Sequence, residues 1–149
     1  MIRNVHTRHI PNAGHLVDRI TELWPSPPWP ALVLDRPLGR GATGGHAFIR
    51  YRCTSYVPGQ RIEFTFDPSI GLIGAHTFEA VPGGLRHTIV GSTRGWARLT
   101  WPLAIRHLHD ALVEDLLDNA ARAAGHPPLH PNRWSPWVRL LRALAKRKV

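Results

Sequence analysis

The chain has 149 residues, a length that suits one domain with a sizeable core and no need of disulfide bonds. Its single cysteine cannot form an internal disulfide, and no stretch resembles a signal peptide or approaches the ~20 apolar residues of a membrane-spanning helix, so we expect a cytoplasmic protein. The formal net charge is +9, but residues 126–149 hold six basic side chains and no acidic one. Without zinc-finger spacing or an exposed aromatic and basic platform, this charge does not predict nucleic-acid binding.

The first third of the chain predicts a strand, a helix and a rigid connector. Residues 3–10 alternate weakly between apolar and polar, and Asn12 can cap a helix that gathers Leu16, Val17, Ile20 and Leu23 on one side. Four prolines between Trp24 and Pro30 exclude a helix or a central strand, and a short apolar run at 31–34 follows. The glycines from 39 to 45 lead into a strand rather than a helix, so they do not form a phosphate-binding loop.

Four strands are predicted next, at about 45–57, 60–67, 71–81 and 85–97, with proline-glycine turns between them. A two-residue turn places odd positions of one strand opposite even positions of the next, because side chains alternate between the faces of a sheet. At Pro58-Gly59 this rule puts one apolar set on a common side, which we call the core face: Ile49, Tyr51, Cys53 and Ser55 beside Ile62, Phe64 and Phe66.

The second turn, Pro82-Gly83-Gly84, places two histidines on the core face. A two-residue register puts His76 and His87 among apolar neighbours, with Arg86 and Thr88 on the other side. The two imidazoles would then be diagonal neighbours, close enough for one ligand to contact both.

A long helix is predicted at about 101–124, ending at Gly125. Its apolar stripe is Trp101, Ile105, Leu108, Leu112, Leu116 and Ala123, and the opposite stripe is Asp110, Glu114 and Asp118. Two polar residues, His109 and Asn119, interrupt the apolar stripe. A helix of this kind is expected to lie across the core face of the antiparallel sheet, with its stripe toward the two histidines.

The C-terminal part, 126–149, predicts a proline-containing linker and a short basic amphipathic helix from about Ser135. One side gathers Trp137, Leu140, Leu141 and Leu144, and the other gathers Arg139, Arg142, Lys146 and Arg147. Such a helix either packs on its own domain with a solvated basic face, or lets residues 134–148 contact an anionic membrane surface or a partner protein.

Several short segments resemble one known superfamily. They are Arg3-Asn4-Val5-His6, Trp29-Pro30, Leu34-Asp35-Arg36-Pro37-Leu38, Gly44-Gly45-His46, Ile49-Arg50-Tyr51, Leu85-Arg86-His87 and Leu108-His109-Asp110-Ala111-Leu112. Together with the element order, they resemble the SRPBCC superfamily of START-like proteins, and within it an actinobacterial-type branch. The resemblance implies an α+β helix-grip domain over residues 1–125, with a curved antiparallel sheet around a long helix and a hydrophobic cavity between them. Members of the superfamily include lipid carriers, polyketide cyclases or dehydratases and chaperone activators, and shared fold does not carry a reaction over.

The candidate ligand-binding residues are mostly apolar and aromatic with a few polar anchors, a composition typical of small-molecule sites. They are Tyr51, Cys53, Phe64, Phe66, His76, Phe78, His87, Ile89, Thr93, Trp101, Ile105, His109, Leu112 and Asn119. The leading hypothesis is a protein that binds a small apolar or aromatic molecule. The alternatives are a cyclase-like enzyme in which His76, His87 and His109 transfer protons and Tyr51 stabilises an enolate, and a peripheral membrane or interaction module. We expect no cofactor and no metal, since no carboxylate is evident to orient a three-histidine site.

Overall fold

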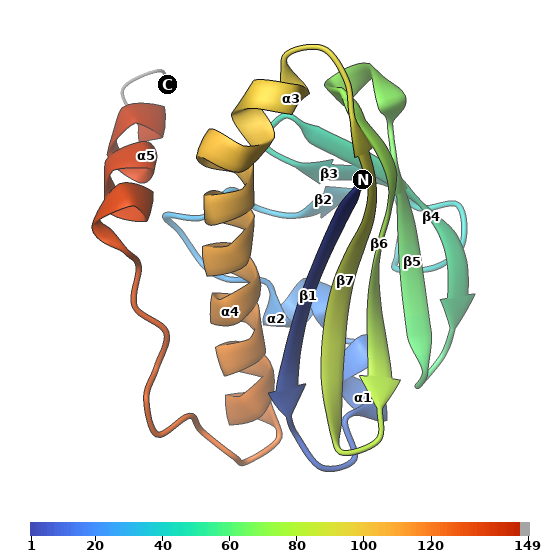
Figure 1. Ribbon diagram of the computed structural model, residues 1–149. Coiled ribbons are helices and arrows are strands. Elements are labelled where there is room, and N and C mark those ends of the chain that lie inside the picture. The colour runs from blue at the N-terminus through green and yellow to red at the C-terminus, as the bar shows by residue number, and fades with distance from the viewer. Residues whose placement is uncertain (147–149) are drawn as a thin grey trace.

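The computed structural model describes residues 1–146, which form one curved antiparallel sheet and a set of helices packed against it (Figure 1). The strand order is β1-β7-β6-β5-β4-β3-β2. The strands are β1 (Ile2–His9), β2 (Val33–Leu34), β3 (Thr43–His46), β4 (Ile49–Val57), β5 (Arg61–Phe66), β6 (Leu72–Val81) and β7 (Gly84–Thr93). A long helix, α4 (Arg106–Ala123), lies against this sheet, which confirms the predicted α+β helix-grip fold.

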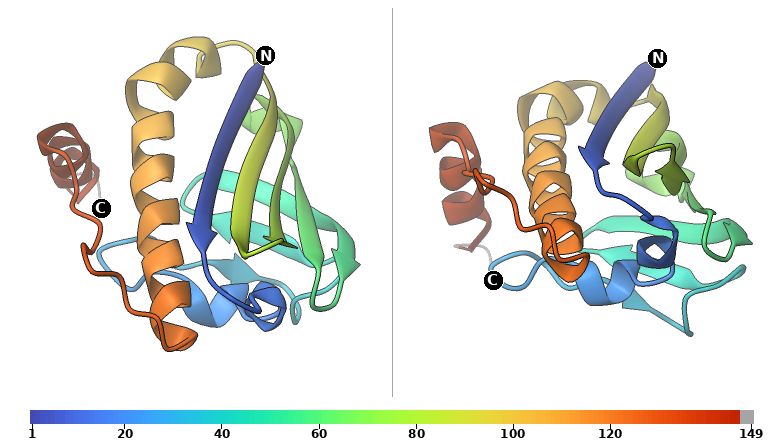
Figure 2. Two further views of the ribbon diagram at one scale, coloured as in Figure 1. Left: turned by 60° about the horizontal axis from the view of Figure 1, so that its bottom comes forward. Right: turned by 90° about the horizontal axis from the view of Figure 1, so that it is seen from below.

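Shorter helices flank the sheet and α4 (Figure 2). They are α1 (Gly14–Val17), α2 (Ile20–Leu23), the 3-10 turn η1 (Pro68–Ile70), α3 (Ala97–Thr100), the π-helical turn η2 (Trp101–Ile105) and α5 (Pro136–Lys146). The last of these, α5, lies beside α4 on the side away from the sheet. Within residues 1–146, no helix combines the length and the apolar character needed to cross a bilayer.

The β6–β7 hairpin has the predicted register. Val81 pairs with Gly84 across Pro82-Gly83, His76 pairs with Ile89, and Phe78 pairs with His87. The two histidines are therefore diagonal neighbours on the core face, and both are buried.

The β4–β5 hairpin departs from the predicted register near its turn. Val57 pairs with Arg61, so the loop has three residues, and a bulge between Cys53 and Ser55 restores the expected pairing farther along the strands. As a result Tyr56, and not Ser55, pairs with Ile62, whereas Cys53 still pairs with Phe64.

The predicted strand at 45–57 is wrong at its start, because the chain folds back on itself at Ala47-Phe48. His46 pairs with Ile49 across this turn, and Ala47 has φ +50°. The turn lacks the glycine or asparagine that usually marks such a conformation, so no local pattern predicts it. Gly45 permits the close strand approach, because a Cβ there would collide with the backbone of Ile49.

The predicted strand at 85–97 is too long, and the predicted helix starts too late. Strand β7 ends at Thr93, Gly95 turns the chain with φ +59°, and α3 begins at Ala97. At the other end, the helix stops at Gly125 as predicted: Gly125 has φ +80°, and its N–H donates to the carbonyl of Arg122.

The predicted helix after Asn12 is also altered. Asn12 has φ +55° and is not the N-cap, and the helix is split into α1 and α2. Asparagine tolerates this left-handed conformation better than most residues. The predicted apolar side is nevertheless buried, with Leu16, Val17, Ile20 and Leu23 in the core.

Helix α4 is buried on more sides than one apolar stripe accounts for. Val113, Leu117 and Ala120 are buried beside the predicted residues, whereas Ala123 is exposed. The acidic stripe is not a solvated face, because it lies against β1 and Asp118 is only 4% exposed. The segment after Gly125 covers α4 further, and Asn132 N–H donates to Asp118 Oδ2 at 2.7 Å.

Helix α5 packs with a face that belongs to neither predicted side alone. Val138 is buried and Leu141 and Arg142 are half-buried, with Arg142 on the cavity wall, whereas Trp137, Leu140 and Leu144 are 43%, 48% and 47% exposed. Arg147, the last residue of the predicted basic side, lies outside the described residues.

Candidate functional site

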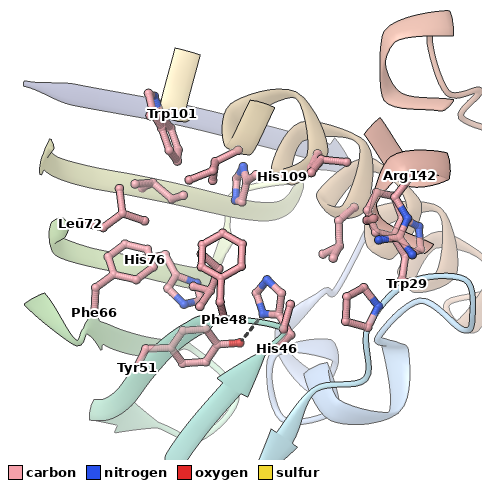
Figure 3. Close-up of a pocket in the computed structure, with 18 of the residues that line it drawn as sticks. Trp29, His46, Phe48, Tyr51, Phe66, Leu72, His76, Trp101, His109 and Arg142 are labelled. Carbon is pink, nitrogen blue, oxygen red and sulfur yellow. Dashed lines mark hydrogen bonds between the residues drawn. The ribbon is translucent and has the colours of Figure 1, made fainter. Parts of the chain in front are cut away.

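A cavity of about 640 Å³ lies between the sheet, α4 and α5 (Figure 3). Sites for drug-sized ligands occupy roughly 300–1,000 Å³ and have mostly apolar walls, so this cavity is large enough for such a molecule. The sheet side of its wall includes His46, Phe48, Ile49, Tyr51, Phe66, Leu72, His76 and Ile89. The helical side includes Trp101, Ile105, Leu108, His109, Leu112, Arg142, Ala145 and Lys146, and the connector adds Pro28, Trp29 and Pro30.

The structure brings many of the predicted site residues to this cavity and leaves others away from it. Those that line it are Tyr51, Phe66, His76, Ile89, Trp101, Ile105, His109 and Leu112. Cys53, Phe64, Phe78 and His87 are buried in the core of the sheet without lining the cavity. Thr93 lies at the end of β7, and Asn119 donates its side-chain N–H to the carbonyl of Leu23 at 3.0 Å.

Sequence reasoning missed part of the wall. His46 and Phe48 reach the cavity because of the unforeseen turn at Ala47-Phe48. Arg142 reaches it because the inner face of α5 differs from the predicted one. The rigid connector predicted between Trp24 and Pro30 also lines the cavity, through Pro28, Trp29 and Pro30.

His76 and His87 form a hydrogen-bonded pair, with 3.2 Å between His76 Nδ1 and His87 Nε2. One imidazole must donate this bond and the other must accept it. Neither His76 Nε2 nor His87 Nδ1 has a protein partner among the described residues. Because buried polar atoms are normally hydrogen-bonded, His76 Nε2 is an unsatisfied group at the cavity wall.

Aromatic rings hold the His76 imidazole in place. The rings of Phe64 and Phe66 stack against it with centroids at 5.2 and 5.1 Å, and Tyr51 meets it edge-on at 4.6 Å. The Tyr51 hydroxyl is hydrogen-bonded to His46 Nδ1 at 3.0 Å, as the dashed line in Figure 3 shows. The polar atoms of the sheet wall are therefore fixed in position before any ligand enters.

Burial keeps the imidazoles and the phenol at this site uncharged. Desolvation lowers the pKa of His46 to about 4 and holds the pKa values of His76 and His87 well below the ordinary 6.5. It also lowers the pKa of His109 and raises that of the Tyr51 phenol. At neutral pH these side chains can donate or accept hydrogen bonds but carry no charge.

His109 connects the cavity to a charged cluster at the seam of β1 and α4. Its ring lies 4.9 Å from that of His87 and 6.0 Å from that of His6, between centroids, and its Nδ1 lies 3.5 Å from Asp110 Oδ1. His6 donates to Glu114 Oε1 at 2.8 Å and to Asp110 Oδ1 at 2.9 Å. These two carboxylates raise the pKa of His6 to about 9, so it is an imidazolium at neutral pH.

One group of residues in the described part of the chain is close enough to share a metal ion: His6, His109 and Asp110, with ligand atoms within 4.8 Å of one another. His6 and Asp110 are already hydrogen-bonded to each other, so a metal would have to displace a proton from the imidazolium. His76, His87 and His109 do not make such a group among these residues.

Comparisons with known proteins identify the fold. No family model matches the chain, and no curated protein matches it. Among solved structures, a protein from Thermobifida fusca is similar with a TM-score of 0.57 and 18% identity, over 87% of this chain and 97% of that one. CalU16 from Micromonospora echinospora has a TM-score of 0.52 and 11% identity, over 99% and 94% of the two chains. DynU16, a protein of the dynemicin biosynthetic locus, has a TM-score of 0.52 and 16% identity, over 85% of this chain and 48% of that one. At such identities the likeness shows the fold alone.

Proposed function

We propose that the protein binds a small, largely apolar molecule in the cavity between its sheet and α4. The observation that carries this proposal is the cavity of about 640 Å³, whose wall is mostly apolar and includes the side chains of His46, Tyr51 and His76. The apolar body of a ligand would be desolvated by Phe66, Leu72 and Trp101, and the polar side chains would orient a carbonyl or hydroxyl group on it.

Electrostatics favour binding over acid-base catalysis. A general base works best when its pKa lies near the working pH, and burial lowers the pKa values of His76 and His87 well below 6.5. Within residues 1–146, no carboxylate is hydrogen-bonded to either imidazole. The cyclase-like alternative needs a ligand that raises these pKa values, whereas binding uses the neutral imidazoles as they stand.

A titration with N-phenyl-1-naphthylamine, an uncharged probe that fluoresces in apolar surroundings, tests the proposal. We expect saturable binding at one site per chain. The Ile105→Trp variant, which adds bulk at the cavity wall, is expected to weaken binding at least about tenfold, since a tenfold loss corresponds to only ~1.4 kcal/mol.

Leu103→Trp is the matched control, because Leu103 is two residues away, 61% exposed and outside the cavity wall. It should bind the probe as the unmodified chain does. Equal binding by all three proteins, or no saturable binding by any, would argue against the cavity as the site.

The exposed face of α5 supports a second candidate function, contact with an anionic membrane. Trp137, Leu140 and Leu144 present apolar surface to solvent beside the basic residue Arg139. An apolar helix face flanked by basic residues suits the interface of a negatively charged bilayer. This contact is compatible with ligand binding, because α5 uses its other face to line the cavity.

A further inference from the structure

The charged residues of the cavity wall are all basic and all come from α5. Arg142 and Lys146 line the cavity, and no aspartate or glutamate does so among the described residues. In Figure 3, Arg142 and Trp29 lie at one end of the site, and Phe66, Leu72 and Trp101 lie toward the other. The site thus has an apolar end and a cationic end.

The Arg142 guanidinium is held in place but not neutralised by the described residues. Its Cζ lies 5.0 Å from the centroid of the Trp29 ring, a cation–π arrangement. Within residues 1–146 it forms no salt bridge, and its buried Nε has no hydrogen-bond partner. Burial lowers its pKa, because desolvation penalises the cation, and an anionic partner would offset that penalty.

The carboxylate on the other side of Trp29 has other partners. Asp115 Oδ2 accepts from the indole N–H of Trp29 at 2.7 Å and of Trp134 at 2.9 Å. Asp115 Oδ1 accepts from the side chain of Asn132 at 2.7 Å. Asp115 therefore orients Trp29 beneath the guanidinium while its own oxygens are occupied.

We infer that the ligand of this cavity is an amphipathic anion, with an apolar body among Phe66, Leu72 and Trp101 and a carboxylate-like group at Arg142. This inference rests on the proposed ligand-binding function and adds the chemical class of the ligand. A guanidinium offers paired N–H donors that match the two oxygens of a carboxylate, and Lys146 adds a second positive charge at the same end. The neutral histidines contact the body of the ligand and do not select for or against a charge on it.

A matched pair of fluorescent probes tests the inference: 1-pyrenebutyrate and 1-pyrenebutanol share one apolar body and differ in the anionic group. At pH 7.5 we expect the full chain to bind pyrenebutyrate at least about tenfold more tightly than pyrenebutanol. In Arg142→Gln this preference should fall to about threefold or less, and Arg142→Lys should keep part of it.

Arg139→Gln is the control, since Arg139 is an exposed arginine of the same helix that does not line the cavity. It should retain the full preference, which shows that lost net charge alone does not account for the effect. Binding of both probes with equal affinity, or an unchanged preference in Arg142→Gln, would overturn the inference and leave the proposed function standing. If neither probe binds, the proposed function fails and the inference fails with it.

Discussion

His6 shows how a single residue joins the edge strand to the long helix. After Ile2, the side chains of β1 that face inward are polar, and Asn4, His6 and Arg8 meet Asp110, Glu114 and Asp118 on α4. Arg8 alone donates to Asp118 Oδ1 at 2.7 Å and to Glu114 Oε2 at 2.9 Å. The weak alternation of apolar and polar residues in β1 therefore reflects polar side chains that pair with α4, and not a poorly formed apolar face.

We expect His6→Gln to lower the free energy of unfolding by about 2 kcal/mol near pH 6, because it removes two hydrogen bonds to charged groups. The pKa of His6 is raised to about 9 in the folded protein from an ordinary 6.5. The contribution is thus fully present below about pH 6.5 and is lost as the pH rises through 9. Urea unfolding of both proteins from pH 6 to pH 10 measures this difference.

Arg106→Gln is the matched control at the same seam, since Arg106 is exposed and its Nε lies 3.9 Å from Asp110 Oδ2. Its effect should stay below about 1 kcal/mol, as is usual for surface ion pairs. A His6→Gln effect that stays constant between pH 6 and pH 10 would contradict the assignment of an imidazolium.

At the scale of elements, the register of a hairpin is predicted best where its turn contains residues with a strong turn preference, such as proline and glycine. The Pro82-Gly83 turn fixed the β6–β7 register, so His76 and His87 were expected on one face as diagonal neighbours. The turn at Ala47-Phe48 has no residue of that kind, so it was not predicted. For the same reason His46 and Phe48 were not among the predicted site residues. The bulge in β4 was equally hidden, because an extra residue in a strand changes no local pattern.

The prediction of which face of α5 packs inward was wrong for a different reason. Hydrophobic periodicity predicts which side of a helix is apolar but not which side the tertiary structure covers. Here Val138 and Arg142 pack inward, with Arg142 against Trp29. Three large apolar residues of the same helix, Trp137, Leu140 and Leu144, remain exposed. The contact between Arg142 and Trp29 joins residues more than a hundred positions apart, so a local window of sequence cannot predict it.

The exposed face of α5 gives a prediction about membranes. The full chain should sediment with vesicles of phosphatidylcholine and phosphatidylserine and much less with phosphatidylcholine alone, because basic residues flank the apolar face. The double variant Leu140→Ser, Leu144→Ser should reduce the bound fraction several-fold. Both substitutions lie on the exposed side of α5, so the cavity wall is kept.

Leu129→Ser is the matched control for this experiment, since Leu129 is 93% exposed but lies in the linker before α5. Its bound fraction should equal that of the unmodified chain. If the double variant sediments as well as the control, the face of α5 is not a membrane contact.

At the scale of the whole molecule, charge and apolar surface are distributed to different parts of the fold. Asp110, Glu114 and Asp118 of α4 are paired at the seam with β1, the cavity wall carries neutral imidazoles, and Arg142 and Lys146 of α5 add basic side chains to it. The sequence predicted the antiparallel sheet and the long helix, and the family resemblance implied a cavity between them. It did not predict the cationic end, because that end depends on how the C-terminal segment folds back across α4.

The most direct test of this account is a crystal structure of the full chain grown with N-phenyl-1-naphthylamine. We expect electron density for the probe inside the cavity, between Phe66 and Trp101. Side chains such as Phe48 and Trp29 filling that space, with the probe absent or bound on the outer surface, would contradict it.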